Sequence, residues 1–298
     1  MVQQTPSRIA ILAGGGSLPV EAAVGAQEAG HEVLVVAIAD EADLSPLPPS
    51  IEQSGIEWGQ IGALIKMLAD YKADRLVIVG SISKRPDYRS LRLDWGAVQL
   101  LPKILTIVLG GGDATVLDKI AGLFFERGFE LAGVQDVAPS LIVGEGHLAG
   151  PKANATVDQD ADSAAHAAWT TGHLDMGQGA VTVNGRIVAM EGAEGTDGLL
   201  ERVQGMREAK RFTSKGRAGV LAKCLRPKQD MRLDVPAIGP QTIINAHAAG
   251  LSGVVLEAGG VLISQREKTF ALCAEHGISL FARPRASFVP ADREDVLA

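Results

Sequence analysis

The first half of the chain alternates between short apolar runs and segments whose apolar residues have helical spacing. Ile9–Leu12 and Arg75–Val79 are short apolar runs, and Glu32–Ala37 contains Val-Leu-Val-Val, which is typical of a buried strand. Between these runs, Leu18–Ala29 and Ile61–Leu68 have the spacing of helices. Such alternation indicates a parallel sheet with right-handed crossovers. We therefore expect a Rossmann-like α/β domain with a mainly parallel sheet.

Two further segments complete this expected domain. Asp40–Pro49 is polar and rich in proline, and it is predicted to be a loop. Asp113–Arg127 is predicted to be a helix, with glycines before it and Gly128 after it. Asp113 has the position of a helix N-cap, the commonest role of aspartate there. A metal or substrate contact is the alternative role for Asp113.

The stretch Gly144–Asp158 interrupts these patterns. It consists largely of glycine, proline and small polar residues, and it has little periodicity. We interpret this stretch as a linker between two domains. Residues 1–143 then form the N-terminal domain and residues 159–298 the C-terminal domain.

The C-terminal half is also predicted to be α/β, but it begins with an antiparallel hairpin. Ala180–Val183 and Arg186–Ala189 flank Asn184-Gly185, a strong signal for a two-residue hairpin turn. Further strands are expected at Gly219–Lys223 and Gly253–Leu256. Helices are expected at Ala161–Trp169, Thr196–Arg207, Thr242–Ala249 and Lys268–His276. The second domain should therefore contain a mixed sheet.

Composition and charge narrow the class of protein. The 298 residues are 46% hydrophobic and 21% charged, which excludes a disordered chain. A net charge of −7 argues against broad electrostatic binding to nucleic acid, so we expect no nucleic-acid partner. Cys224 and Cys273 belong to no CxxC motif or Cys/His cluster, so neither a disulfide framework nor a zinc site is indicated. No stretch approaches the ~20 apolar residues of a membrane span, and we expect a cytoplasmic protein.

A glycine-rich turn is the first candidate for binding chemistry. Gly14-Gly15-Gly16-Ser17 lies between a predicted strand and a predicted helix, where backbone N–H groups bind phosphate well. A dinucleotide fingerprint also needs an acid near the end of the second strand, where Asp40 lies, but Pro19 replaces its third glycine. Phosphate or nucleotide contact is the preferred interpretation. A tight turn without a ligand and NAD(P) binding are the alternatives.

Two segments on either side of the predicted hairpin combine glycines with acids. In Asp175–Gly179, two glycines flank Gln178, which suggests a backbone that approaches a ligand closely. Glu191–Asp197 follows the hairpin and has three acids within seven residues. We interpret this cluster as a functional site. The alternative for Asp197 is a structural one, because acids are favoured at helix N-termini.

The segment Lys223–Pro236 is the densest group of charges in the chain. Its prolines and charges exclude a long regular element, so it is predicted to be an irregular loop after a strand. Its cations are suited to neutralising a diphosphate. Asp230 and Asp234 offer the oxygen ligands that Mg²⁺ prefers. A solvated loop with internal salt bridges is the alternative.

Four stretches of the sequence together carry a resemblance to a known family. They read GGGSLP, DMGQGAVTVNGRIVAMEGAEGTDGLLERV, KCLRPKQDMRLDVPAIGPQTI and AHAAGLSGVVLEAGG. In this order they resemble the UDP-2,3-diacylglucosamine pyrophosphatases of the LpxI type, over nearly the whole chain. Arg226-Pro227-Lys228 stands where the family usually has Lys-Pro, which is a conservative change.

The resemblance implies a metal-dependent hydrolase of lipid A biosynthesis. Its substrate is UDP-2,3-diacylglucosamine, and its products are UMP and 2,3-diacylglucosamine 1-phosphate (lipid X). The resemblance also implies two α/β domains, Mg²⁺ or Mn²⁺ as cofactor, attack of water at the β-phosphorus, and weak contact with the inner membrane surface. Two alternatives stay open: an NAD(P)-dependent oxidoreductase that uses the GGGSLP turn, and a non-enzymatic carrier of lipid or nucleotide.

The residues and the resemblance together define a candidate site. The candidate catalytic residues are Asp230, Asp234, Lys223 and Arg226. The candidate metal ligands are Asp230, Asp197 and Asp234. The candidate substrate-binding residues are Gly14, Gly15, Gly16, Ser17, Gly80, Gln178, Gly179, Glu194, Gly195, Thr196, Lys228, Gln229 and Arg232.

Overall fold

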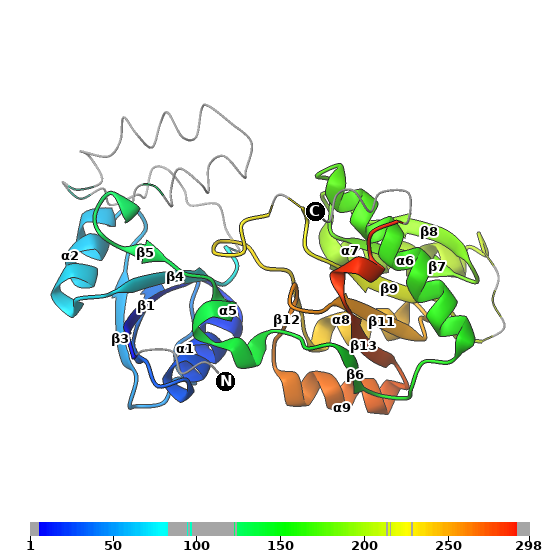
Figure 1. Ribbon diagram of the computed structural model, residues 1–298, viewed down its shortest axis with the longest axis horizontal. Coiled ribbons are helices and arrows are strands. Elements are labelled where there is room, and N and C mark those ends of the chain that lie inside the picture. The colour runs from blue at the N-terminus through cyan, green and yellow to red at the C-terminus, as the bar shows by residue number, and fades with distance from the viewer. Residues whose placement is uncertain are drawn as a thin grey trace. The chain divides into compact units, whose positions relative to one another are not determined.

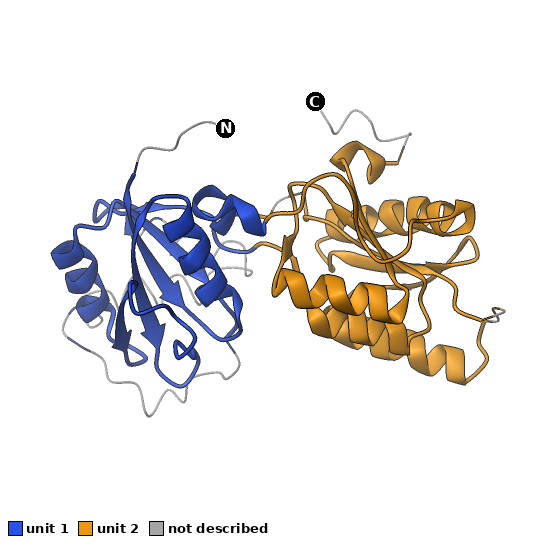
Figure 2. Cartoon of the chain, turned by 90° about the horizontal axis from the view of Figure 1, so that it is seen from below, with its two compact units in different colours: residues 1–141, 230–234 blue, residues 142–229, 235–298 orange. Residues whose placement is uncertain are grey.

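The protein is described here by a computed structural model. The structure describes residues 6–82, 94, 96, 122, 124–212, 214, 216–227 and 229–290. The chain divides into two compact units (Figure 2). The first contains Met1–Leu141 together with Asp230–Asp234, and the second contains Ile142–Gln229 and Val235–Ala298.

The first unit is built on a five-stranded sheet with the strand order β3-β2-β1-β4-β5 (Figure 1). All four strand pairings are parallel, as the sequence predicted. The strands are β1 (Arg8–Ala13), β2 (Glu32–Ile38), β3 (Glu52–Ile56), β4 (Arg75–Val79) and β5 (Glu130–Leu131). Among the described residues, the helical segments of this unit include α1 (Leu18–Glu28), α2 (Ile61–Tyr71), α5 (Val134–Val137) and the 3₁₀ turn η1 (Pro139–Leu141).

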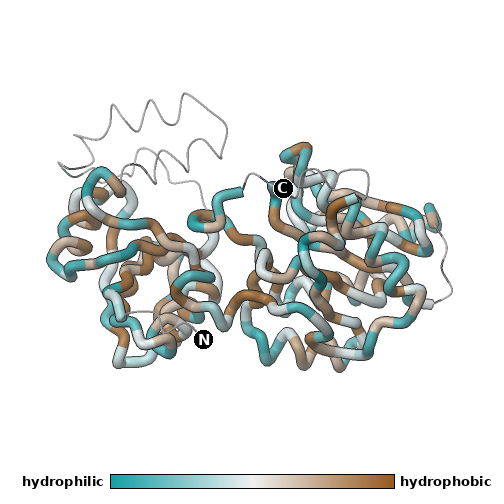
Figure 3. The backbone as a smooth tube through the Cα atoms, in the orientation of Figure 1, coloured by the Kyte–Doolittle hydropathy of each residue, from teal (hydrophilic) through white to brown (hydrophobic). Residues whose placement is uncertain are grey.

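Small side chains let α1 approach its neighbours closely. Its buried positions are Pro19 and residues 22, 23, 25 and 26, all alanine or glycine. A Cβ at Gly25 would lie 2.9 Å from the Cβ of Ala138, so only glycine fits at that contact. Figure 3 shows hydrophobic residues along the central strands of the sheet. Alanine and glycine at the buried positions of α1 thus allow this helix to pack closely against its neighbours.

The second unit contains a six-stranded mixed sheet with the order β6-β13-β11-β9-β7-β8. The strands β9, β11 and β13 pair in parallel, whereas β6, β7 and β8 pair antiparallel. The strands are β6 (Gly146–Ala149), β7 (Gly179–Val183), β8 (Arg186–Met190), β9 (Val220–Lys223), β11 (Gly253–Glu257) and β13 (Ser279–Arg283). A short separate parallel pair is formed by β10 (Ala237–Ile238) and β12 (Leu262–Ile263).

Helices cover both faces of this sheet. On one face, α6 (Ala155–His173) packs against Val220 and Ala222 of β9. On the opposite face, Leu221 packs into a cluster with residues of the remaining helices. These helices are α7 (Gly195–Glu208), α8 (Pro240–Ala248) and α9 (Arg266–His276), and the 3₁₀ turn η2 (Arg285–Ser287) follows β13. Because successive side chains of a strand point to opposite faces of the sheet, Lys223 lies on the same face as Leu221, which is the face covered by α7 and α8.

The structure differs from the sequence prediction at the expected linker and at residues 230–234. The expected linker at residues 144–158 is not an irregular connection, because it contains β6 and the first turn of α6. Residues 230–234 belong to the first unit rather than to the second. Asp113 and most of its predicted helix lie outside the described residues. Within the described part of the chain, no helix is long and apolar enough to cross a membrane.

Candidate active site

The glycine turn of the first unit lies at a topological switch point. It follows β1, and Gly80 follows β4, which is the neighbour of β1 on the side opposite to β2. Ligands of open parallel sheets bind outside the carboxyl ends of the strands where the strand order reverses. The structure therefore brings Gly14–Ser17 and Gly80 to one edge, where a phosphate or nucleotide site is expected.

Contacts between these two turns account for several of the glycines. Gly14 donates from its N–H to the carbonyl of Val79, and Gly15 and Ser81 exchange two backbone hydrogen bonds. A Cβ at Gly14 would lie 2.7 Å from the carbonyl oxygen of Ser81, and one at Gly80 would lie 2.7 Å from the carbonyl carbon of Gly14. Gly16 has a φ of +89°, which glycine adopts readily. The close approach is thus between two parts of the chain, and ligand contact there stays a prediction.

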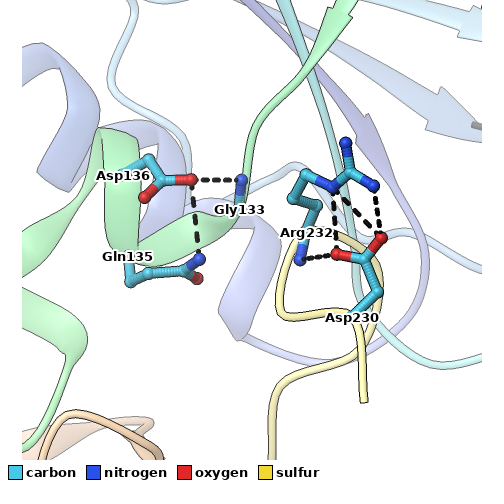
Figure 4. Close-up of polar contacts among 5 residues, drawn as sticks. All are labelled: Gly133, Gln135, Asp136, Asp230 and Arg232. Atoms are coloured by element: carbon cyan, nitrogen blue, oxygen red, sulfur yellow. Dashed lines mark hydrogen bonds and ion pairs between the residues drawn. The ribbon is translucent and has the colours of Figure 1, made fainter. Parts of the chain in front are cut away.

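Asp230 is held in a tight turn by its own neighbours. Its carboxylate accepts hydrogen bonds from the backbone N–H of Arg232 (2.9 Å) and from the Arg232 guanidinium (2.6–3.1 Å), as Figure 4 shows. Its carbonyl accepts from the N–H groups of Leu233 and Asp234. The hydrogen bonds from Arg232 lower the pKa of the Asp230 carboxyl below its usual range. Asp230 is therefore ionised at neutral pH, as a metal ligand or general base must be.

The turn is attached to the first unit by Leu233, which packs against the cluster of β1, β2, β4 and α2 side chains. This apolar anchor leaves Asp230 and Asp234 half-buried within their turn.

In the same unit, Asp136 accepts from the N–H of Gly133 (2.8 Å) and caps α5, so its carboxylate has a structural role (Figure 4).

The candidate metal ligands fit a site in which the protein supplies only one or two of the ligands. Within the described residues, no three His, Cys, Asp or Glu side chains come together as a metal-binding group. Asp230 and Asp234 lie on one turn of the first unit, whereas Asp197 lies in the second unit and accepts a hydrogen bond from Asn245 (2.9 Å). Mg²⁺ is often held by one or two carboxylates together with substrate phosphates and water. The carboxylates of the Asp230 turn fit that mode.

In the second unit, the structure brings Lys223 and Thr196 together with Glu191. The Lys223 ammonium donates to the Thr196 hydroxyl (2.8 Å) and to the carbonyl of Ala237 (3.0 Å). The Thr196 hydroxyl donates to the Glu191 carboxylate (3.1 Å). Lys223 and Glu191 are only 6% and 5% exposed. Burial raises the pKa of Glu191, while the charge of Lys223 opposes that change.

Glu191 also explains the glycines that flank Gln178. A Cβ at Gly179 would lie 2.5 Å from a carboxylate oxygen of Glu191, and one at Gly177 would lie 2.5 Å from its carbonyl oxygen. The sequence indicated that this backbone approaches a ligand, but here it approaches Glu191. The side-chain oxygen of Gln178 is buried and has no hydrogen-bond partner among the described residues.

The other predicted residues are distributed around this group. Arg226 forms an ion pair with Asp175 (3.0 Å), and its N–H donates to the side chain of Gln229 (3.2 Å). Glu194 is exposed and forms an ion pair with Arg202 (2.6 Å), just before Gly195 begins α7. Lys228 lies outside the described residues. The loop after β9 is therefore held by the ion pair of Arg226 with Asp175 and by the hydrogen bond between Arg226 and Gln229.

Sequence reasoning missed one buried acid that fixes the start of this loop. Glu257, at the end of β11, is 3% exposed, accepts from the N–H of Leu225 (3.0 Å) and pairs with Arg285 (2.9 Å). Glu191 was noticed only as one member of the acidic cluster. Both residues share one sequence signal, which is an acid at the end of an apolar run. Glu191 directly follows β8, and Glu257 is the last residue of β11.

Comparison with known proteins covers nearly the whole chain. A model of the LpxI N-terminal domain matches residues 8–141, and a model of the LpxI C-terminal domain matches residues 144–281. The chain is 35% identical over 274 residues to a UDP-2,3-diacylglucosamine pyrophosphatase LpxI from Caulobacter vibrioides, covering 91% of this chain and 95% of that protein. The chain belongs to the LpxI family. The resemblance inferred from the four sequence stretches is thus confirmed.

Solved structures give much weaker matches to this LpxI-family chain. The Bordetella bronchiseptica enzyme WbmG in complex with NAD and UDP is 22% identical, with a TM-score of 0.28, over 43% of this chain and 37% of that one. Glycinamide-RNase-transformylase T from Mycobacterium tuberculosis is 14% identical, with a TM-score of 0.23, over 61% of this chain and 43% of that one. Likenesses of this size carry no argument about function.

Proposed function

We propose that the protein hydrolyses the diphosphate of UDP-2,3-diacylglucosamine to UMP and 2,3-diacylglucosamine 1-phosphate, as a step of lipid A biosynthesis. The observation that carries the proposal is the 35% identity to the Caulobacter vibrioides pyrophosphatase over 95% of that protein. Family membership favours hydrolysis over the NAD(P)-dependent and carrier alternatives. Pro19 in the first turn of α1 also departs from a dinucleotide fingerprint.

The reaction adds one water across the diphosphate. In our proposal the water oxygen attacks the β-phosphorus, the bond from that phosphorus to the bridging oxygen breaks, and UMP leaves with the bridging oxygen. Asp230 orients the water and accepts its proton, a role for which its ionised state is suited. Lys223 and Arg226 stabilise the negative charge on the leaving UMP.

Mg²⁺ or Mn²⁺ is the proposed cofactor, held through Asp230 and Asp234 and through the substrate diphosphate. A bound divalent cation neutralises phosphate charge and favours ionisation of a bound water. Asp197 is the less favoured ligand, because its carboxylate is engaged by Asn245. Chelation by EDTA should therefore abolish turnover, and added Mg²⁺ or Mn²⁺ should restore it.

The phosphate and acyl parts of the substrate have separate proposed sites. The diphosphate or the nucleoside is proposed to contact the turns at Gly14–Ser17 and Gly80, at the switch point of the first sheet. The second unit has a groove of about 720 Å³, lined by Met176, Met190 and two glycines and by the charged side chains of Glu194, Glu201 and Arg202. We assign one acyl chain to this groove, because methionines adapt their shape to apolar partners. We also propose that the protein makes weak contact with the inner membrane surface, because its proposed substrate carries acyl chains.

The test is turnover of the purified protein with UDP-2,3-diacylglucosamine, followed as UMP release with and without EDTA. In ¹⁸O-water the label should appear in 2,3-diacylglucosamine 1-phosphate, whereas label in UMP would rule out attack at the β-phosphorus. Absence of UMP release in the presence of Mg²⁺ and Mn²⁺ would refute the proposed function.

The role of Asp230 is tested by Asp230→Ala. We expect turnover to fall by on the order of 10²-fold or more, equivalent to about 2.7 kcal/mol in the activation barrier, while the melting temperature falls by no more than about 4 °C. Asp70→Asn is the matched control, since Asp70 is an exposed acid of the same unit in an ion pair with Lys66. Near-normal turnover of Asp230→Ala would move the role to Asp234 or Asp197.

A further inference from the structure

The group of Lys223, Thr196 and Glu191 is fixed by the pairing of two strands. Lys223 is directly opposite Gly179 in the β9–β7 pair, so both lie on one face of the sheet. Because Gly179 has no side chain, the Glu191 carboxylate fills the space above it, beside Lys223. Thr196 enters from the first turn of α7, which packs on the same face.

The chemistry of the three groups sets the direction of every proton in this chain of hydrogen bonds. A lysine ammonium only donates, and an ionised carboxylate only accepts. The Thr196 hydroxyl has a single proton, and that proton is directed to Glu191 (3.1 Å). Its oxygen accepts from Lys223 (2.8 Å). The one donor of the Thr196 side chain is therefore engaged within the protein.

We propose that Glu191 and Thr196 are positioning residues for Lys223, and that the Thr196 hydroxyl does not contact the substrate. This inference rests on the proposed function and revises the expectation that Thr196 binds substrate. The hydroxyl and the carboxylate hold the ammonium at a fixed point at the start of the 224–236 loop. A charge fixed in a poorly solvated position stabilises developing phosphate charge better than a mobile, exposed lysine does.

The competing explanation is that these residues only stabilise the fold. A buried lysine and glutamate need partners whatever the function is, and removing one partner of such a group destabilises a protein. The two explanations differ in how the variants behave once they are folded. A positioning role requires that the loss of turnover in Thr196 variants depends on Lys223, and a purely structural role does not.

The experiment measures kcat and KM for UMP release from UDP-2,3-diacylglucosamine, together with melting temperature. Thr196→Val keeps the shape and removes the hydroxyl, and Thr196→Ser keeps the hydroxyl. We expect at least a tenfold loss of kcat in Thr196→Val with KM changed less than threefold, and kcat within threefold of wild type in Thr196→Ser. Glu208→Gln, an exposed acid at the end of α7, should stay within twofold of wild type.

A double-mutant cycle isolates the dependence on Lys223. Thr196→Val should lower kcat no further in a Lys223→Met background. Full additivity of the two losses would overturn the proposal, as would a folded Thr196→Val variant with wild-type kcat.

If Thr196→Val does not fold, Glu191→Gln decides the question. Glutamine has the shape of glutamate and accepts from Thr196, but it lacks the charge, so a tenfold lower kcat supports the proposal. Wild-type kcat in Glu191→Gln overturns it, and so does failure of both variants to fold. A wild-type protein that releases no UMP refutes the proposed function instead.

Discussion

Replacing Gly179 by alanine tests the packing of Glu191 most directly. The new Cβ would lie 2.5 Å from a Glu191 carboxylate oxygen and 3.4 Å from the carbonyl oxygen of Ala222, so the carboxylate must move. Movement breaks the hydrogen bond from Thr196. Overpacking costs ~1–3 kcal/mol, and loss of a hydrogen bond to a charged group costs ~1.5–3 kcal/mol. We expect the variant to lose about 3 kcal/mol of unfolding free energy.

A loss of this size is easily measured. It corresponds to a decrease of about 6–12 °C in melting temperature for a domain of ~150–250 residues, measured by circular dichroism or calorimetry. Gly205→Ala is the matched control, because Gly205 is an exposed residue of α7 with no atom within 4 Å of an added Cβ. That variant should gain up to ~1 kcal/mol through helix propensity. Equal melting temperatures for Gly179→Ala and the wild type would refute the packing argument.

Three further predictions concern charge, thiols and the acyl groove. Because its pKa is lowered in the folded state, Asp230 stabilises the fold above the ordinary aspartate value of 3.8 and loses that effect as pH falls through the lower value. In urea titrations Asp230→Asn should therefore be less stable than wild type at pH 7, by about 0.5–1 kcal/mol, and the gap should close toward pH 2; a constant gap would contradict this. Burial raises the pKa of Cys224, and that of Cys273 to about 12, so neither thiol should react with Ellman's reagent until the protein is unfolded. Met176→Asp should raise KM more for long-chain than for short-chain substrates, whereas Leu174→Asp, exposed but outside the groove, should not; equal effects would argue against the groove.

Elements with strong local signals were predictable from the sequence. The hairpin at Asn184-Gly185 is present, and both residues have positive φ, as its turn type requires. The strands β3, β5 and β6 were missed, and they lie at sheet edges. The short pair β10 and β12 and the interior strand β13 were missed as well. Glu52–Ile56 has no buried residue and therefore no apolar pattern. Its place in the sheet depends on pairing with β2, which a local pattern does not encode.

The candidate site was predictable only in part, for a similar reason. Lys223 and Thr196 were selected from charge density and motif, and the structure does bring them together. Glu191 and Glu257 share one local signal, an acid at the end of an apolar run, but their burial follows from tertiary contacts that this signal does not encode. The glycines beside Gln178 were correctly identified as a close approach. The partner in that approach was predicted to be a ligand, and it is Glu191.

The path of the chain between the two units limits how this protein can be divided. Residues 230–234 belong to the first unit, although the residues on both sides of them belong to the second. A gene fragment that ends at residue 141 therefore lacks Leu233, which packs against the core of that unit. The matching downstream fragment carries this pentapeptide without the surface it packs on. Recombination between homologous genes at the boundary near residue 142 would join an Asp230 turn to a foreign first unit, so the two halves are expected to be inherited together.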